Sequence, residues 1–232
     1  MSRIVWDGTG ERFYENGVDR GVLFRKAANG SGYETGVVWN GLTAVNESHE
    51  GGDKNDIFAD NIKYLSLTSQ ERFSGTIEAY TYPEEFEVCD GSAMVADGVF
   101  AGQQPRRPFG FSYRTMIGND LAQEWYKLHI VWNATAEASD KDNATQTDSP
   151  DAKTFSWSFS TDPVTITKVS GIKPTAHFVI DSRYIPQEKL TLVENKLYGT
   201  DADSTASPAV EATEPELPTP DWIIEQVGTT NG

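Results

Sequence analysis

The stretch YKLHIVWN, residues 126–133, decides the fold. It places large apolar side chains at every second position, at Tyr126, Leu128, Ile130 and Trp132. A period of two is that of a β-strand, whose successive side chains point to opposite faces. The segment TFSWSFST, residues 154–161, repeats the pattern with aromatic rings opposite a row of serines. Both segments are therefore predicted to be half-buried strands, with one face in the core and the other in solvent.

Outward from these two segments, other runs of similar length lie between Gly, Pro, Asn and Asp residues, which favour turns. They are residues 35–42, 62–69, 74–82, 108–118 and 176–181. A helical period appears in residues 186–199, where Leu190, Val193 and Leu197 share a face and Gly199 can end the helix. A shorter helical turn is predicted in residues 83–91. We predict a mainly β fold of two packed antiparallel sheets, a sandwich or barrel, flanked by one α-helix.

Charge and composition limit the possible partners. The 232 residues include 35 acidic and 19 basic side chains, a formal net charge of -16. This balance argues against binding to duplex DNA through its phosphates, which requires clustered Lys and Arg. The single cysteine, Cys89, excludes an intramolecular disulfide and agrees with assembly in a reducing compartment. Because no signal peptide or membrane helix is recognisable, we expect a non-membrane product that assembles in the cytoplasm.

The C-terminal segment differs in composition from the rest of the chain. Residues 201–232 contain acidic side chains but no Lys or Arg, and are rich in Pro, Ala, Ser and Thr. We predict that residues 1–200 form the β domain and that residues 201–232 form an acidic, Pro-rich tether that ends in a short helix. Trp222 and Ile223 give this helix an apolar side, which must dock on its own domain or on a neighbour because so short a helix is unstable alone.

Sites for metals and catalysis were sought in the two long loops expected at residues 46–61 and 136–152. Neither loop has the Gly and Glu spacing of an EF-hand, so no calcium site is predicted from their side chains with oxygen ligands, which are Asp53, Asn55, Asp56, Asp140, Asp142 and Asn143. The acidic group at residues 84–90 is better explained by a helix start than by a glycosidase pair. The three histidines are far apart in sequence. We predict no catalytic residue, cofactor or metal.

Several blocks of sequence together resemble a known family. They include ADNIKYLSL, ERFSGTIEAYTYPEEFEVCDGSA, FAGQQPRRPFGFSYRTMIGND, YKLHIVWNATA, TDSPDAKTFSWSFSTDPV and LPTPDWII, in that order from about Val37 to the C-terminal segment. The chain resembles the major tail proteins, also called tail tube proteins, of long-tailed non-contractile bacteriophages. The resemblance implies homohexameric rings that stack, with inner sheets joined into a continuous β-barrel around a channel for the genome. It implies no enzymatic activity.

The same resemblance implies partners and a location. The partners are further copies of the chain, the tape measure protein, and the tail tip and tail terminator proteins. DNA would pass through the channel without specific binding, which agrees with a negatively charged wall. The protein is expected in the tail of the virion, and in the host cytoplasm during assembly.

Candidate contact residues follow from these expectations. Two prolines flank Arg106 and Arg107 and favour an extended backbone, so these arginines can reach a carboxylate of an adjacent subunit; solvation or an internal pair is the alternative. The loop at residues 46–61 is expected to reach the next ring. The predicted contacts between subunits or rings are Arg106, Arg107, Asp53, Asp56, Asp60, Trp222 and Ile223. The predicted channel residues, which could equally face outward, are Glu71 and Glu78.

The sequence is also compatible with a second class of function, a ligand-binding module. Alternating strands with Trp39, Trp132 and Trp157 are compatible with a carbohydrate- or ligand-binding β-sandwich module. Tryptophans in alternating strands are more often part of the core, and a glycosidase that uses the acidic group at residues 84–90 is a weaker alternative still.

Overall fold

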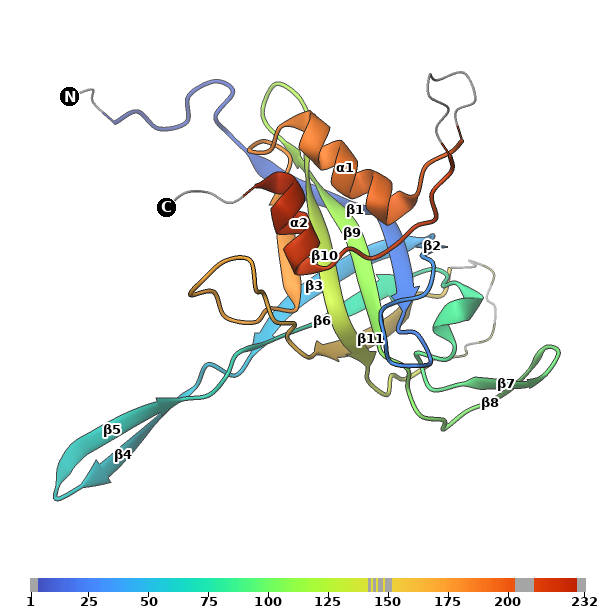
Figure 1. The fold of residues 1–232 in the computed structure, drawn as a ribbon, viewed down its shortest axis with the longest axis horizontal. Helices are drawn as coiled ribbons and strands as arrows, with labels where there is room; N and C mark the ends of the chain where they lie inside the picture. Colours follow the sequence, from blue (N-terminus) through green and yellow to red (C-terminus); the bar gives the residue numbers. More distant parts are fainter. Residues whose placement is uncertain are drawn as a thin grey trace.

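Two layers of antiparallel strands form the body of the protein, and the predicted fold class is confirmed (Figure 1). The computed structural model describes residues 4–141, 143, 145, 148, 152–202 and 211–228. The first layer runs in the order β2 (Val37–Trp39), β1 (Tyr14–Arg25), β9 (Phe109–Gly118) and β10 (Trp125–Ala136), with β12 (His177–Asp181) also paired to β10. The second layer consists of β11 (Phe155–Thr161), β6 (Arg72–Ala79) and β3 (Leu42–Glu50).

Strand β10 belongs to both layers and joins them into one open sheet. On one edge it pairs with β9 from Trp125 to Ala134; on the other edge it pairs with β12 up to Val131 and with β11 from Ala134 to Ala136. The change of partner coincides with a break in register between Val131 and Ala134, where Asn133 takes a left-handed backbone with φ 48°. Asn is one of the few residues other than Gly that adopt this conformation readily. The sheet therefore folds over itself at Asn133.

Contacts of the Asn133 side chain hold this bend in place. Its Oδ1 accepts hydrogen bonds from Lys26 Nζ at 2.8 Å and from Tyr33 Oη at 3.0 Å, while its backbone N–H donates to the same Tyr33 oxygen. Lys26 and Tyr33 lie on the two sides of the turn after β1 and are joined by an isolated bridge. The bend of β10 and the end of β1 therefore stabilise each other.

One apolar core fills the space between the two layers. Its aromatic rings include Trp39, Phe111, Trp157 and Phe159, all almost fully buried, with Phe86 between them. Trp39 packs against Phe86 and Trp157 with ring centroids 4.6 and 5.6 Å apart. Phe86 comes from a single 3-10 turn at Glu84–Phe86, which is the short helical turn predicted in residues 83–91.

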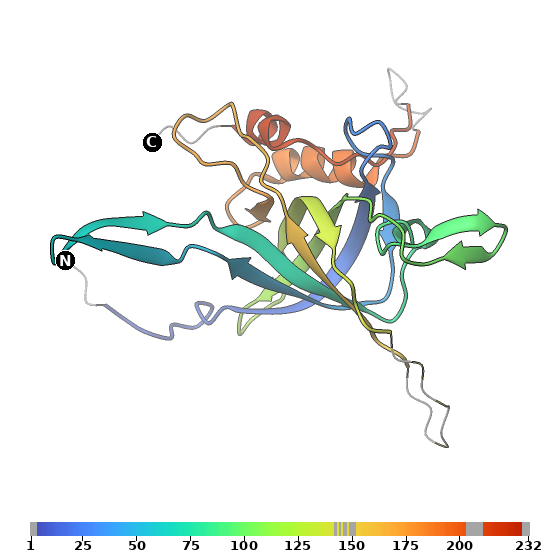
Figure 2. The same cartoon turned by 90° about the horizontal axis from the view of Figure 1, so that it is seen from below.

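A second apolar core lies on the outer face of the first layer, under two helices. Helix α1 (Gln187–Tyr198) buries Leu190, Val193 and Leu197, the residues predicted to share its apolar face. Helix α2 (Pro220–Val227) packs beside it and buries Ile223. Both helices lie on one side of the first layer, and the second layer, formed by β3, β6 and β11, lies on its other side (Figure 2). The order of layers is helices, first strand layer, second strand layer.

The described part of the C-terminal segment, residues 211–228, packs on its own chain. Thr213 forms an isolated bridge with Thr200, and Trp132 Nε1 donates to the carbonyl of Pro218 at 2.9 Å. Leu217 is buried directly over Gly110, where a β-carbon would overlap its side chain. Residues 203–210 of the predicted tether lie outside the described residues, and the division of the chain at residue 200 stays a prediction.

Two expectations from the sequence were wrong. Residues 46–61 are not a loop, because β3 continues to Glu50 and a separate hairpin follows, formed by β4 (Lys54–Ala59) and β5 (Ile62–Thr68). Strand β10 is not half-exposed: Tyr126, Leu128, Ile130 and Trp132 do face one core, but the opposite face, with His129 and Val131, is buried between the layers. The predicted loop at residues 136–152 lies partly outside the described residues. No helix in the described ranges is long and apolar enough to cross a membrane.

The bend at Asn133 makes a stability prediction. We expect Asn133→Ala to lower the free energy of unfolding by about 2–4 kcal/mol, because it removes three side-chain hydrogen bonds, the third a long one from Nδ2 to the carbonyl of Asp162, and leaves a left-handed backbone that Ala disfavours by about 1–2 kcal/mol. Asn133→Gly loses the same hydrogen bonds without the backbone cost, and is expected to be more stable than the Ala variant by about 1–2 kcal/mol. Urea unfolding measures both. If the Ala and Gly variants lost equal amounts of unfolding free energy, backbone strain at residue 133 would be contradicted.

Candidate assembly surfaces and a buried histidine cluster

The hairpin β4–β5 projects from the body as a two-stranded arm (Figures 1 and 2). Its strands pair with each other and with no other described strand. Large apolar side chains stand exposed along it, including Phe58 at 67%, Tyr64 at 68% and Ile62 at 64% of their full area. An isolated hairpin is marginally stable in water, and contiguous exposed apolar side chains mark interaction surfaces. Within the described ranges of the chain, nothing covers the apolar side chains of the arm.

The three aspartates predicted as contacts all lie on or beside this arm. Asp53 precedes β4, where its backbone N–H donates to Ser69 Oγ. Asp56 lies within the ribbon and accepts from Ser66 at 2.6 Å and from Lys63 at 2.7 Å, which together lower the pKa of its carboxyl. Asp60 occupies the tip, where it and Asn61 have positive φ as a tight hairpin turn requires. Asp60 is the one of the three at the free end of the arm.

A second, shorter hairpin extends from the opposite side of the body (Figure 2). It is formed by β7 (Ala93–Ala96) and β8 (Val99–Ala101). Its apolar side chains are also exposed, among them Met94, Val95, Val99 and Phe100. The sequence analysis did not identify this hairpin, because its strands are only four and three residues long. The protein thus carries unpartnered apolar surface on two arms that point in opposite directions.

The adjacent arginines that follow this hairpin have different surroundings. Arg107 pairs with Glu34 and donates to the carbonyl of Lys26, both within its own chain. Arg25 pairs with the same Glu34 at 2.9 Å. Arg106 is partly buried, and its Nε has no hydrogen-bond partner among the described residues. The structure therefore gives Arg107 the internal pair that the sequence left as the alternative, and leaves Arg106 as the candidate for contact with a neighbour.

The outer face of the second layer is a regular grid of small polar side chains. Three rows run across β3, β6 and β11, and each row holds one residue from each strand. The rows are Ala44, Glu78 and Ser156; Asn46, Thr76 and Ser158; and Ser48, Ser74 and Ser160. The alternate residues of these strands, such as Phe73, Ile77 and Trp157, point into the core. We call the nine residues the polar face; it contains one carboxylate and no Lys or Arg.

The predicted channel residues fall in two places. Glu78 lies on the polar face, where its Oε1 accepts from Asn46 Nδ2 at 3.3 Å. Glu71 precedes β6, outside the polar face, with its carboxylate 3.9 Å from His49 Nε2. The structure therefore places Glu78, and not Glu71, on the uncovered sheet surface.

The remaining predicted contacts and the alternative site are mostly buried. Ile223 packs into the second core, so its side chain is used within its own subunit, and Trp222 is partly buried beside it. Trp39, Trp132 and Trp157 are at most 2% exposed. Sugar-binding tryptophans must present a ring face to the ligand, so these three cannot form a stacking platform. The carbohydrate-binding alternative loses the residues on which it depended.

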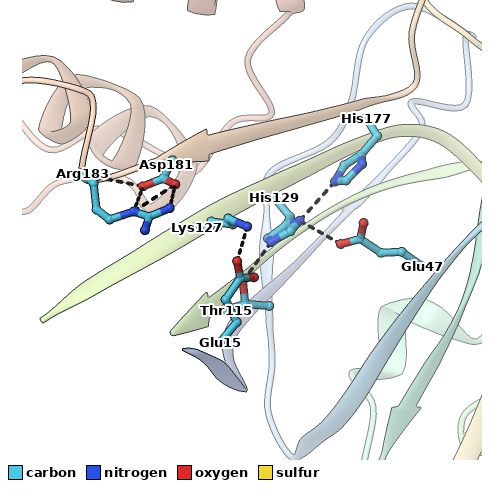
Figure 3. Close-up of polar contacts among 8 residues, drawn as sticks. All are labelled: Glu15, Glu47, Thr115, Lys127, His129, His177, Asp181 and Arg183. Atoms are coloured by element: carbon cyan, nitrogen blue, oxygen red, sulfur yellow. Dashed lines mark hydrogen bonds and ion pairs between the residues drawn. The ribbon is translucent and has the colours of Figure 1, made fainter. Parts of the chain in front are cut away.

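Sequence reasoning missed a cluster of Glu47, His129 and His177 between the layers (Figure 3). His129 Nδ1 lies 3.0 Å from Glu47 Oε1 and 3.2 Å from His177 Nε2. The other ring nitrogen of His129 lies 3.0 Å from the Thr115 hydroxyl, and Tyr113 donates to Glu47 Oε1 at 2.7 Å. No local motif could have revealed the cluster, because its members come from β3, β10 and β12. The one sequence signal was His129, which lies between apolar positions of β10. It would have pointed to the cluster only if that face of β10 had also been predicted to be buried.

Burial and hydrogen bonding set the charges of this cluster. The hydrogen bond from His129 lowers the pKa of Glu47 to about 2, and the hydroxyl of Tyr113 acts in the same direction. Burial lowers the pKa of His177 to about 4, because the charged imidazolium loses hydration. At neutral pH Glu47 is therefore ionised and His177 is neutral. Stacked rings enclose the group, with Tyr113 on His129 at 4.5 Å and Phe73 on His177 at 4.2 Å.

The two neighbouring arginines provide a matched pair of variants. We expect Arg107→Ala to lower the free energy of unfolding by about 1–3 kcal/mol, because it removes charge-assisted hydrogen bonds within the chain. Arg106→Ala should cost less than Arg107→Ala, because the partly buried Arg106 side chain has an Nε without a hydrogen-bond partner to lose. Urea unfolding of the two variants under one condition measures the difference. A larger loss for Arg106→Ala than for Arg107→Ala would contradict the assigned pairing.

No protein-family model matches this chain, and no curated protein matches it. Function must therefore be argued from the surfaces described above. The features that require explanation are two apolar arms on opposite sides of the body and a polar sheet face that no helix covers.

Proposed function

We propose that this protein is a structural subunit that polymerises into the tail tube of a long-tailed, non-contractile bacteriophage. Copies would form hexameric rings that stack around a channel for the genome, as the family resemblance of the sequence implies. The observation that carries the proposal is the β4–β5 arm, which exposes a row of large apolar side chains and pairs with no other strand among the described residues. Burying such a surface against other copies is strongly favourable.

The placement of the arms supports head-to-tail assembly. The β4–β5 and β7–β8 hairpins leave the body on opposite sides, so a copy can contact one neighbour through each arm. Contacts between two different surfaces generate rings when the rotation closes, and stacks of rings when the contact lies along the axis. Strand β3 also has a free edge along Leu42–Glu50, which a neighbour's strand would cover.

The polar face supports the channel part of the proposal. Serine, threonine and asparagine side chains are wetted easily, and the single carboxylate of Glu78 in each copy would repel phosphates that come within a Debye length, about 8 Å at physiological salt. No Lys or Arg lies in the three rows, and Arg72 in the next row lies opposite Glu50, so the sheet presents no cluster of cations that would retain DNA. With a net charge of -16 on the chain, the wall of such a channel would let DNA pass without gripping it.

The arm makes the first assembly prediction. The purified full chain is expected to form rings or hollow tubes above a threshold concentration, alone or when seeded with the tail tip complex. Phe58→Ser with Tyr64→Ser should raise that threshold at least about tenfold, because losing about 1.4 kcal/mol of apolar burial changes an equilibrium constant tenfold. Negative-stain electron microscopy and light scattering across a concentration series measure the threshold.

A matched control uses exposed side chains away from the arms. Leu121→Ser with Tyr184→Ser removes comparable exposed apolar area from the body, at 70% and 79% exposure, and should leave the threshold unchanged. Both double variants should retain the unfolding free energy of the wild type within about 1 kcal/mol. If the arm variant assembles as readily as the wild type, the arm is not the joint between subunits.

The polar face makes a second prediction. Thr76→Lys with Ser158→Lys should leave tubes intact but make them retain duplex DNA, in a manner that weakens steeply as salt is raised. Co-sedimentation of tubes with short duplexes measures retention, and Thr76→Gln with Ser158→Gln is the uncharged control. The retained DNA should resist nuclease if the polar face lines the bore. Complete digestion of that DNA would place the polar face on the outside of the tube.

A further inference from the structure

The cluster of Glu47, His129 and His177 has no role in the assembly proposed above, and its geometry is that of a set of metal ligands. We propose that these three side chains bind a zinc ion that ties the two strand layers together. The site does not depend on the tail tube function.

The distances between the ligand atoms match a tetrahedral site. Zinc binds imidazole nitrogen and carboxylate oxygen at about 2.0–2.2 Å, which places neighbouring ligands of a tetrahedron about 3.3–3.5 Å apart. In the structure His129 Nδ1 lies 3.2 Å from His177 Nε2 and 3.0 Å from Glu47 Oε1, and all three ligand atoms lie within 4.8 Å of one another. Side-chain rotation that brings Glu47 Oε1 and His177 Nε2 to a similar separation would admit the ion.

Lone pairs face one another in the metal-free cluster. The facing nitrogens of His129 and His177 can hold only one hydrogen between them, since two would clash. Whichever ring carries it, the other ring presents a nitrogen lone pair toward the centre of the cluster, beside the carboxylate of Glu47. A cation at the centre would satisfy a lone pair on each of the three ligands at once. Two imidazoles and one carboxylate form a donor set that suits zinc better than calcium or magnesium, which prefer oxygen.

Partners around the cluster would orient the ligands. Zinc-binding histidines usually donate their second ring N–H to an oxygen, and His129 Nε2 has the Thr115 hydroxyl at 3.0 Å. When Nδ1 binds the metal, the ring hydrogen lies on Nε2, which donates a hydrogen bond to the Thr115 hydroxyl oxygen. Tyr113 donates to Glu47 Oε1 and holds that carboxylate in place. The fourth position would be taken by water.

An entry path exists on the side of His177. A pocket lined by His49, Phe73, His177, Glu71 and Lys173, among others, reaches the His177 side chain. Glu47 is itself about one third exposed, with 32% of its side-chain area accessible. Because Glu47 comes from the second layer and the two histidines from the first, a bound ion would link β3 to β10 and β12.

The test uses the full chain without a histidine tag, stripped of metal with a chelator and then dialysed against zinc chloride. We expect one zinc per chain, and a rise in melting temperature of about 5–10 °C when free zinc is 100-fold above its dissociation constant. His177→Gln and Glu47→Gln should each weaken binding at least about tenfold, as loss of a ligand does. His49→Gln, at the rim of the same pocket, is the matched control and should bind as the wild type does.

Cobalt provides a second measurement on the unmodified chain, which does not depend on the folding of any variant. Co²⁺ in place of zinc should give the intense visible absorption of a tetrahedral site, saturating at one equivalent and abolished by added zinc. Absence of that spectrum together with absence of zinc binding by the wild type would overturn the proposal. So would zinc binding that His177→Gln and Glu47→Gln leave unchanged, since the ion would then sit elsewhere.

Discussion

The fold depends on one bend, at Asn133. Up to that residue β10 is the central strand of the first layer, and after it the same strand pairs with β11 of the second. The bend places the aromatic side chains of both layers in one core and leaves the outer face of the first layer free for the helices. A straight β10 would extend a flat sheet and leave both sets of apolar side chains without a covering layer.

Within a single chain the body buries its apolar side chains, whereas the two hairpin arms leave theirs exposed. Each face of the first layer is buried, and the C-terminal segment completes one of those cores through Trp132, Leu217 and Ile223. The arms are different, because their apolar side chains face water and nothing in the described part of the chain covers them. An exposed apolar surface of this kind promotes aggregation of a monomer. In a subunit the same surface favours assembly, since self-association removes it from solvent.

The sequence predicted what depends on local periodicity. The period of two assigned Tyr126, Leu128, Ile130 and Trp132 to one face of β10, and the helical spacing located α1 and its buried side chains. It could not predict what depends on contacts between layers. His129 reads as a solvent-facing residue in an alternating strand, and only the second layer buries it beside Glu47 and His177. The β4–β5 arm was interpreted as a loop because its first strand is polar and short, and its turn at Asp60 and Asn61 lacks glycine.

The polar face has a mechanical consequence for a tube built from this subunit. Its side chains are short, chiefly serine, threonine, asparagine and alanine, and they extend little beyond the backbone of β3, β6 and β11. Long side chains change rotamer and would make the width of a bore fluctuate, whereas a wall of short ones has a width set by hydrogen-bonded strands, which are rigid. The calibre of such a bore would therefore be fixed by the sheet, uniform along its length and indifferent to the sequence of the DNA inside it.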